Sequence, residues 1–316
     1  KDGPTRGELE QVKIQLISGF VKGLEQLGGF GGKADILASN YVYTGNPHHY
    51  LKEWEWIRSA TRQDLKEVAG RWLSDGLYQL EIRPFPRLQA SNESPDRSGI
   101  PEPGEPPLAK FDDFERVTLD NGMNVILAER DAIPVVNLAL SVDAGYASDQ
   151  FSRAGVARLA MNMMDEGTDS RDALDISDEL ITLGATLGTS SNLDRSTVSM
   201  STLSTTLVDA LELFSDVVLN PAFPEKEMER LRTQQLTGIQ REKTSPNAMA
   251  GRVLPGLIFG DDHAYSNPLA GSGTIESTKS ITLDELRAFH DTWFKPNQAT
   301  LIIVGDTTME EVLPQL

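Results

Sequence analysis

Four histidines are the side chains best suited to bind a metal ion, and their spacing does not form a recognisable ligand motif. His48 and His49 are adjacent, so on a regular element they diverge and cannot converge on one ion. The run 261–263 (Asp-Asp-His) could bind a divalent cation on a loop, but we favour a solvated acidic turn. His290 lies in a helical pattern, where we expect a surface or boundary residue. The chain has no cysteine, which excludes thiolate metal sites and a cysteine nucleophile.

A glycine-rich run over 28–33 suggests a phosphate-binding loop but departs from that motif. Leu27 stands where the first glycine of the loop belongs, and Ala34 replaces the Ser or Thr whose hydroxyl would bind Mg²⁺. A strand pattern is also missing before the run. We therefore interpret the run as a flexible connector between two helices.

Composition and charge indicate a globular protein and argue against some kinds of function. The 316 residues are 39% hydrophobic and 24% charged, which is typical of globular proteins. A formal net charge of -18 repels phosphate backbones and argues against nucleic-acid binding. The sequence contains nothing close to the ~18 consecutive apolar residues that a membrane helix requires. The lack of cysteine favours the periplasm, with the cytoplasm as the alternative compartment.

Residues 1–84 have mostly helical patterns. Apolar residues recur at helical spacing over 8–17, and a capping box at Thr61 predicts a helix that runs to about Leu73. The alternating run 77–83 predicts a strand.

Seven prolines between positions 84 and 107 separate this part from the rest of the chain. Because proline removes the N–H donors that helices and central strands need, we predict an interdomain linker over 85–110. The sequence therefore divides into 1–84, the linker and 111–316.

Residues 111–316 combine hairpins with helices. The Asn121-Gly122 pair between 116–119 and 124–127 predicts a tight hairpin turn. The other predicted strands are 135–142, 186–191, 196–203 and 299–304, and the predicted helices are 154–165, 170–183, 205–219, 225–243, 247–259 and 282–294. This order predicts an α+β fold with a mainly antiparallel sheet packed against helices.

The two parts of the chain resemble each other. The residues around Thr61 and Thr282 share a pattern of Ser, Thr, Leu and Trp, and an Asn-Pro pair stands at the same distance upstream of each. Residues 8–19 match 227–238 at nearly the same offset of roughly 220 residues, a plausible size for one domain. We infer a duplication in which 1–84 is the closing part of one repeat and 111–316 is most of a second. The chain is then expected to be an interior segment of a longer protein.

The second repeat resembles the insulinase/pitrilysin (inverzincin) family of zinc metallopeptidases. The resemblance rests on 119–126, on the segment 154–168 and on the closing Leu-Ile-Ile-Val-Gly-Asp run at 301–306. Active members carry an inverted zinc motif, H-x-x-E-H, in the helix of the second segment. Two histidines one turn apart hold the ion, and the Glu accepts a proton from the zinc-bound water. A further Glu about 75 residues later completes the ligands.

The resemblance places four other residues at these positions. Arg158 and Asn162 replace the two histidines, Met161 replaces the Glu, and Gly238 replaces the later Glu. A cationic guanidinium repels Zn²⁺, a thioether cannot accept the proton, and glycine has no side chain. We therefore expect neither catalytic residues nor a metal or cofactor in this segment, with zinc elsewhere in the full-length protein.

The resemblance implies the end of a second domain followed by a degenerate third domain in a peptidase with four similar domains. Such a segment would help form a chamber around peptide or unfolded polypeptide, with the catalytic half as its partner and with peptide adding to a sheet edge. The alternative is an inactive paralogue or subunit that partners a separate active peptidase. An H-x-x-E-H motif encoded upstream of Lys1 would favour the first. Arg158 is expected either to face solvent or to pair with Asp165 or Glu166.

Overall fold

The computed structural model describes residues 3–73, 76, 79–81 and 113–316. The predicted linker and the ends of the predicted strand 77–83 lie outside these residues, so the linker and its boundaries stay predictions. Residues Gln79–Glu81 are described and form no strand, so that part of the strand prediction is wrong.

The N-terminal helices are α1 (Arg6–Gly23), α2 (Lys33–Thr44), α3 (Tyr50–Ser59) and α4 (Arg62–Trp72). Capping boxes at Thr5 and Thr61 begin α1 and α4, because each hydroxyl accepts from a backbone N–H three residues later. The helix predicted from Thr61 is confirmed. The glycine-rich run links α1 to α2, and α2 and α3 were not predicted as separate helices.

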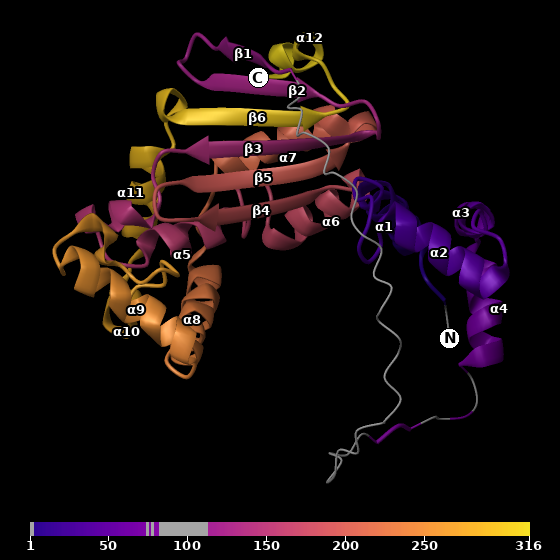
Figure 1. The fold of residues 1–316 in the computed structure, drawn as a ribbon, viewed down its shortest axis with the longest axis horizontal. Coiled ribbons are helices and arrows are strands. Elements are labelled where there is room, and N and C mark those ends of the chain that lie inside the picture. The colour runs from indigo at the N-terminus through magenta and orange to yellow at the C-terminus, as the bar shows by residue number, and fades with distance from the viewer. Residues whose placement is uncertain (1–2, 74–75, 77–78, 82–112) are drawn as a thin grey trace, which may run out of the picture.

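The second part is built on a six-stranded sheet in the order β1-β2-β6-β3-β5-β4 (Figure 1). Its strands are β1 (Glu115–Thr118), β2 (Asn124–Glu129), β3 (Val135–Val142), β4 (Thr186–Ser191), β5 (Ser196–Leu203) and β6 (Ala299–Gly305). All neighbouring pairs are antiparallel except β2 and β6. The predicted α+β class with a mainly antiparallel sheet is confirmed.

Eight helices accompany this sheet among the described residues. They are α5 (Val156–Met163), α6 (Ala173–Leu183), α7 (Leu207–Leu219), α8 (Glu225–Glu242), α9 (Pro246–Phe259), α10 (Ile275–Ser280), α11 (Leu283–Trp293) and α12 (Met309–Val312). In Figure 1 the sheet faces the viewer, with α6 and α7 behind it. Alternation along the strands explains this layering, because Leu138 and Ile303 are buried whereas Ala139 and Ile302 on the opposite face are more accessible.

The core lies between the sheet and its covering helices. Strand residues such as Val136 and Leu138 meet Leu159 of α5, Leu213 of α7 and Leu286 of α11 in one buried cluster. Within the described residues, no helix is both long and apolar enough to cross a membrane.

Helix α1 connects the N-terminal helices to the sheet-bearing part. A Cβ atom added to Gly184, at the end of α6, would lie 3.0 Å from Ser18 Cβ, so the two segments are in close contact. Lys22 Nζ donates to the carbonyl oxygen of Ser201 on β5 at 3.0 Å. Asn137 on β3 donates to Glu25 Oε1 at 3.2 Å.

Candidate functional site

Helix α5 begins at a constrained and buried turn. Gly155 has φ +100°, and a Cβ atom there would lie 2.8 Å from Gln235 Nε2. The N–H groups of Gly155 and Ala157 donate to the two oxygens of Asp149 at 2.7 and 2.9 Å. Burial raises the pKa of Asp149 to about 7, even though both hydrogen bonds favour its charged form. The turn therefore fixes where the following helix presents its side chains.

The α5 positions that the resemblance singled out have different environments. Arg158 and Asn162 are half-buried and one turn apart, so they lie on the same side of the helix. Met161 is fully buried within the apolar core. A carboxylate at position 161 would need a compensating cation or hydrogen bond there.

The fourth position lies on α8, which packs against α5. Gln235 Nε2 donates to the carbonyl oxygens of Gly155 and Ser272, at 3.3 and 3.0 Å. Gly238 follows Gln235 by about one turn, and a Cβ atom added there would have no contact within 4 Å. The structure thus brings together the two helices on which the four positions stand, and it leaves room for a side chain at 238.

Arg158 binds a backbone carbonyl oxygen, and among the described residues no ion pair joins it to an acid. Its Nη1 donates to the carbonyl oxygen of Ala270 at 2.6 Å. Glu166 instead accepts from Arg230 on α8, so the alternative in which Arg158 pairs with Asp165 or Glu166 is wrong. The physical reason is that the segment 270–273 lies beside α5, so a backbone carbonyl oxygen is within hydrogen-bond distance of the Arg158 guanidinium.

A polar network next to these positions was not found from the sequence. Arg252 on α9 contacts Glu242 at the end of α8, and Ser272 Oγ donates to the same carboxylate at 2.9 Å. Arg252 also donates to the carbonyl oxygen of Gly273 at 2.7 Å. The spacing of ten residues between Glu242 and Arg252 spans a helix break, so a helical pattern could not reveal the pair. Together with Gln235, this network holds the segment 270–273 against α5 and α8.

These side chains do not suit zinc. The set contains a guanidinium, a buried thioether, an amide and a glycine, whereas zinc is held by imidazole, thiolate or carboxylate groups. Across the part of the chain that the structure describes, no group of three or more His, Cys, Asp or Glu side chains is arranged to hold a metal ion.

The histidines have local contacts. His263 Nδ1 accepts from the N–H of Tyr265 at 3.0 Å, and its ring stacks on Phe259. His290 is half-buried, as expected for a boundary residue, and its Nε2 lies 2.8 Å from the carbonyl oxygen of Val218. His49 lies directly before α3, and its ring packs edge-on to Trp56.

Comparison with known proteins decides the family. The family model described as "Insulinase (Peptidase family M16)" matches residues 124–271, and the model described as "Peptidase M16 inactive domain" matches 280–316. The chain belongs to the insulinase family. It is 25% identical over 63% of its length to a Mycobacterium leprae protein named as an uncharacterized zinc protease, covering 44% of that protein. It is 26% identical over 81% of its length to the rat mitochondrial-processing peptidase subunit beta, covering 51% of that subunit.

The solved structures agree with this assignment. The insulinase-family chain resembles a peptidase M16 inactive domain from Pseudomonas fluorescens with a TM-score of 0.61 and 29% identity, over 64% of this chain and 49% of the other. The chain spans about half the length of the curated relatives it matches.

Proposed function

We propose that this insulinase-family chain is a non-catalytic segment of a zinc metalloendopeptidase and helps to form the surface on which peptide is held. The supporting observation is the α5–α8 contact, where Arg158, Met161, Asn162 and Gly238 replace the groups that would bind zinc and activate water. Zinc would be supplied by another part of the same protein. The periplasm remains our proposed compartment, because the chain has no cysteine.

The sheet offers two features that fit an extended peptide. Its face opposite the helices carries Asn137, Ala139, Ser199 and Ile302, a mixture of apolar and hydrogen-bonding groups. A shallow pocket of about 470 Å³ lies on this face, over β3, β5, β4 and β6. Among the described strands, β4 lies at the edge of the sheet and pairs only with β5. A peptide could add to that edge through backbone hydrogen bonds, a common mode of peptide recognition.

A second candidate is an inactive subunit that works with a separate active peptidase. The match to a protein named as a subunit supports this alternative. The two candidates differ in whether the gene that encodes this chain also encodes a zinc-binding motif. An H-x-x-E-H motif encoded in the same gene favours the first, and its absence favours the second.

Zinc and an unstructured polypeptide can test whether the chain binds peptide and whether it hydrolyses it. We expect binding without hydrolysis, when casein is incubated with the chain and excess zinc and the products are followed by mass spectrometry. Hydrogen exchange should slow in β4 when casein is present, with β1 at the opposite edge as the internal control. Zinc-dependent cleavage by the chain would contradict the loss of activity. Unchanged exchange in β4 would contradict the peptide-holding role.

A further inference from the structure

The C-terminal half of α1 lies across one end of the sheet. Ser18 lies beside Gly184, two residues before β4 begins, since a Cβ atom at 184 would be 3.0 Å from Ser18 Cβ. One turn later, Lys22 Nζ donates to the carbonyl oxygen of Ser201 on β5 at 3.0 Å. Four residues of α-helix rise by about 6 Å, which is comparable to the spacing of ~4.8 Å between neighbouring strands. In Figure 1, α1 accordingly meets the sheet where β4 begins and β5 ends.

The next contact of this segment is with β3. Glu25 Oε1 accepts a hydrogen bond from Asn137 Nδ2 at 3.2 Å. Asn137 is the register partner of Ser201, so the two residues stand in one row across the sheet. The contacts of residues 18, 22 and 25 therefore follow the strand order β4-β5-β3. We call residues 18–25 the α1 end.

The α1 end covers part of the surface on which we propose that peptide is held. Asn137 and Ser201 line the shallow pocket of about 470 Å³ on the open face of the sheet. Ser201 is also the register partner of Thr186, the first residue of β4. A peptide that paired with the whole of β4, or filled the pocket, would therefore meet the α1 end.

The contact between the α1 end and the sheet is small. Within α1 only Leu9 and Ser18 are buried, and Glu25 is exposed. Burial lowers the pKa of Lys22, because its ammonium group gives up part of its hydration at the sheet. Release of the α1 end would restore that hydration. A segment with so few buried contacts can open at a low cost in free energy.

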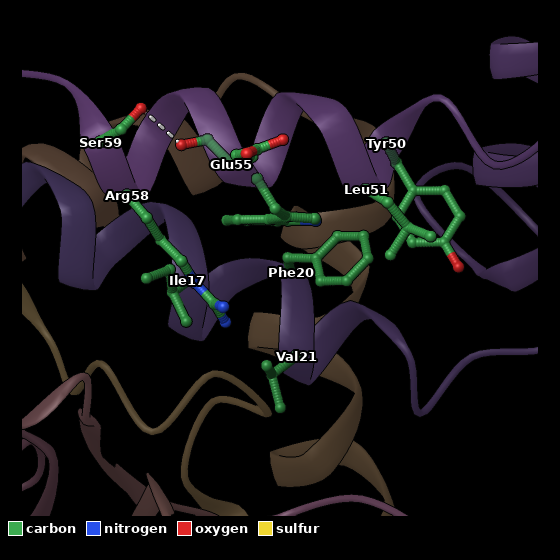
Figure 2. Close-up of a pocket in the computed structure, with 9 residues that line it drawn as sticks. Ile17, Phe20, Val21, Tyr50, Leu51, Glu55, Arg58 and Ser59 are labelled. Carbon is green, nitrogen blue, oxygen red and sulfur yellow. Dashed lines mark hydrogen bonds between the residues drawn. The ribbon is translucent and has the colours of Figure 1, made fainter.

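The opposite side of α1 has room for such a movement. Phe20 stands two residues from both Ser18 and Lys22, about 200° around the helix, so it faces away from the sheet. A pocket of about 590 Å³ lies between α1 and α3, and Phe20 and Leu51 line it (Figure 2). A shift of α1 away from the sheet would be accommodated by this pocket.

We propose that the α1 end is an autoinhibitory segment. In the closed state, which the structure shows, it blocks one end of the peptide-holding surface, and peptide must displace it to pair with the whole of β4. The inference rests on the proposed function, because it requires that peptide binds at this face. The hydrogen bonds of Lys22 and Glu25 favour the closed state and therefore weaken peptide binding.

Removing these two hydrogen bonds tests the proposal. Lys22→Ala with Glu25→Ala should raise the affinity for fluorescently labelled casein about tenfold, because both bonds that favour the closed state are lost. Fluorescence anisotropy measures this affinity. In the unaltered chain, casein should quicken hydrogen exchange in 18–25 while it slows exchange in β4.

The matched control removes the same two charges elsewhere on α1. Lys13 and Glu10 form an ion pair at 3.2 Å, and Lys13 also donates to the carbonyl oxygen of Arg58 on α3. Lys13→Ala with Glu10→Ala should leave the casein affinity within about twofold, because an exposed ion pair contributes little. An equal gain in the two double variants would overturn the proposal.

An engineered disulfide tests the closed state directly. The chain has no cysteine, so Ser18→Cys with Gly184→Cys would supply its only two thiols. Their Cβ atoms would be 3.0 Å apart, near the roughly 3.5–4.5 Å that a disulfide spans. The oxidised variant should bind casein about tenfold more weakly than the same variant when reduced. The reduced form is the control for the strain of a side chain at φ +62°.

The outcomes separate this proposal from the proposed function. Equal casein affinity in the chain and the Lys22→Ala, Glu25→Ala variant, with β4 still protected, overturns the autoinhibitory role alone. Oxidation without effect on affinity does the same, as does slower exchange in the α1 end, which would then be part of the bound surface. Failure of casein to protect β4 in every variant overturns both proposals.

Discussion

Arg158 Nη1 lies 2.6 Å from the carbonyl oxygen of Ala270 and donates a hydrogen bond to it. This bond joins the middle of α5 to the segment 270–273, which Gln235 and Arg252 also contact. At the position that we expect to correspond to a metal-binding histidine of active relatives, the chain therefore has a side chain that connects two backbone segments.

Restoring ligands tests whether these positions form a former metal site. Arg158 and Asn162 are half-buried, and a side chain at 238 would have free space. We expect Arg158→His, Asn162→His and Gly238→Glu together to bind one equivalent of zinc, because two imidazoles one turn apart and a carboxylate supply three ligands. Elemental analysis after dialysis against zinc measures this.

The double variant Asn162→His with Gly238→Glu is the matched control and should bind zinc at least a hundredfold more weakly, because one imidazole ligand is missing. Equal zinc content in the double and triple variants, or none in the triple variant, would contradict the assignment of Arg158 to the first histidine position.

Asp149 should make the free energy of unfolding depend on pH between about pH 4 and pH 7. Burial raises its pKa to about 7, whereas the unfolded carboxyl titrates near 3.8. Between these values the folded protein holds a proton that the unfolded chain has lost, so this group's contribution to stability falls as the pH rises. We expect the free energy of unfolding of the native chain, minus that of Asp149→Asn, to decrease by up to about 4 kcal/mol from pH 4 to pH 7.

Urea unfolding of both proteins at several pH values gives this difference, and an increase with pH would contradict the raised pKa.

Asp216 should stabilise the fold more as the pH rises, which is opposite to Asp149, and its effect should fall at a lower pH. Burial opposes its charge, but hydrogen bonds from Thr168, Asn220, Arg171 and Ser170 outweigh burial and lower its pKa to about 2. Its stabilising contribution is present above the unfolded value of 3.8 and is lost as the pH falls towards 2. We expect Asp216→Asn to cost about 2–3 kcal/mol at pH 7 and much less at pH 3.

Asp209→Asn is the control, because Asp209 is exposed on the same helix and should contribute about 0.5 kcal/mol or less through the helix dipole. A similar cost for the two substitutions at pH 7 would count against the role of the hydrogen bonds around Asp216.

Local patterns in the sequence were sufficient for most elements, but not for the contacts between them. The Asn121-Gly122 hairpin and the Thr61 cap depend on a few neighbouring residues, so they could be predicted. Helix α3 was not predicted, although Tyr50, Trp54 and Ile57 stand at helical spacing in it. The partner of Arg158 could not be found, because Ala270 is 112 residues away and contributes only a backbone carbonyl. The Arg252–Glu242 contact likewise depends on how α9 folds back onto α8.

Two leucines at matching positions provide the sharpest test of the repeat. Leu286 is fully buried in the core on α11, whereas Leu65 occupies the same position on α4 and is exposed. We expect Leu286→Ala to destabilise the chain by about 3–4 kcal/mol, because it removes buried methyl groups and leaves a cavity. Leu65→Ala should cost less than about 1 kcal/mol, since the truncated side chain faces water. Thermal and urea unfolding of both variants measure these costs, with circular dichroism at 222 nm as the common probe. Similar losses at the two positions would contradict the difference in exposure between Leu65 and Leu286.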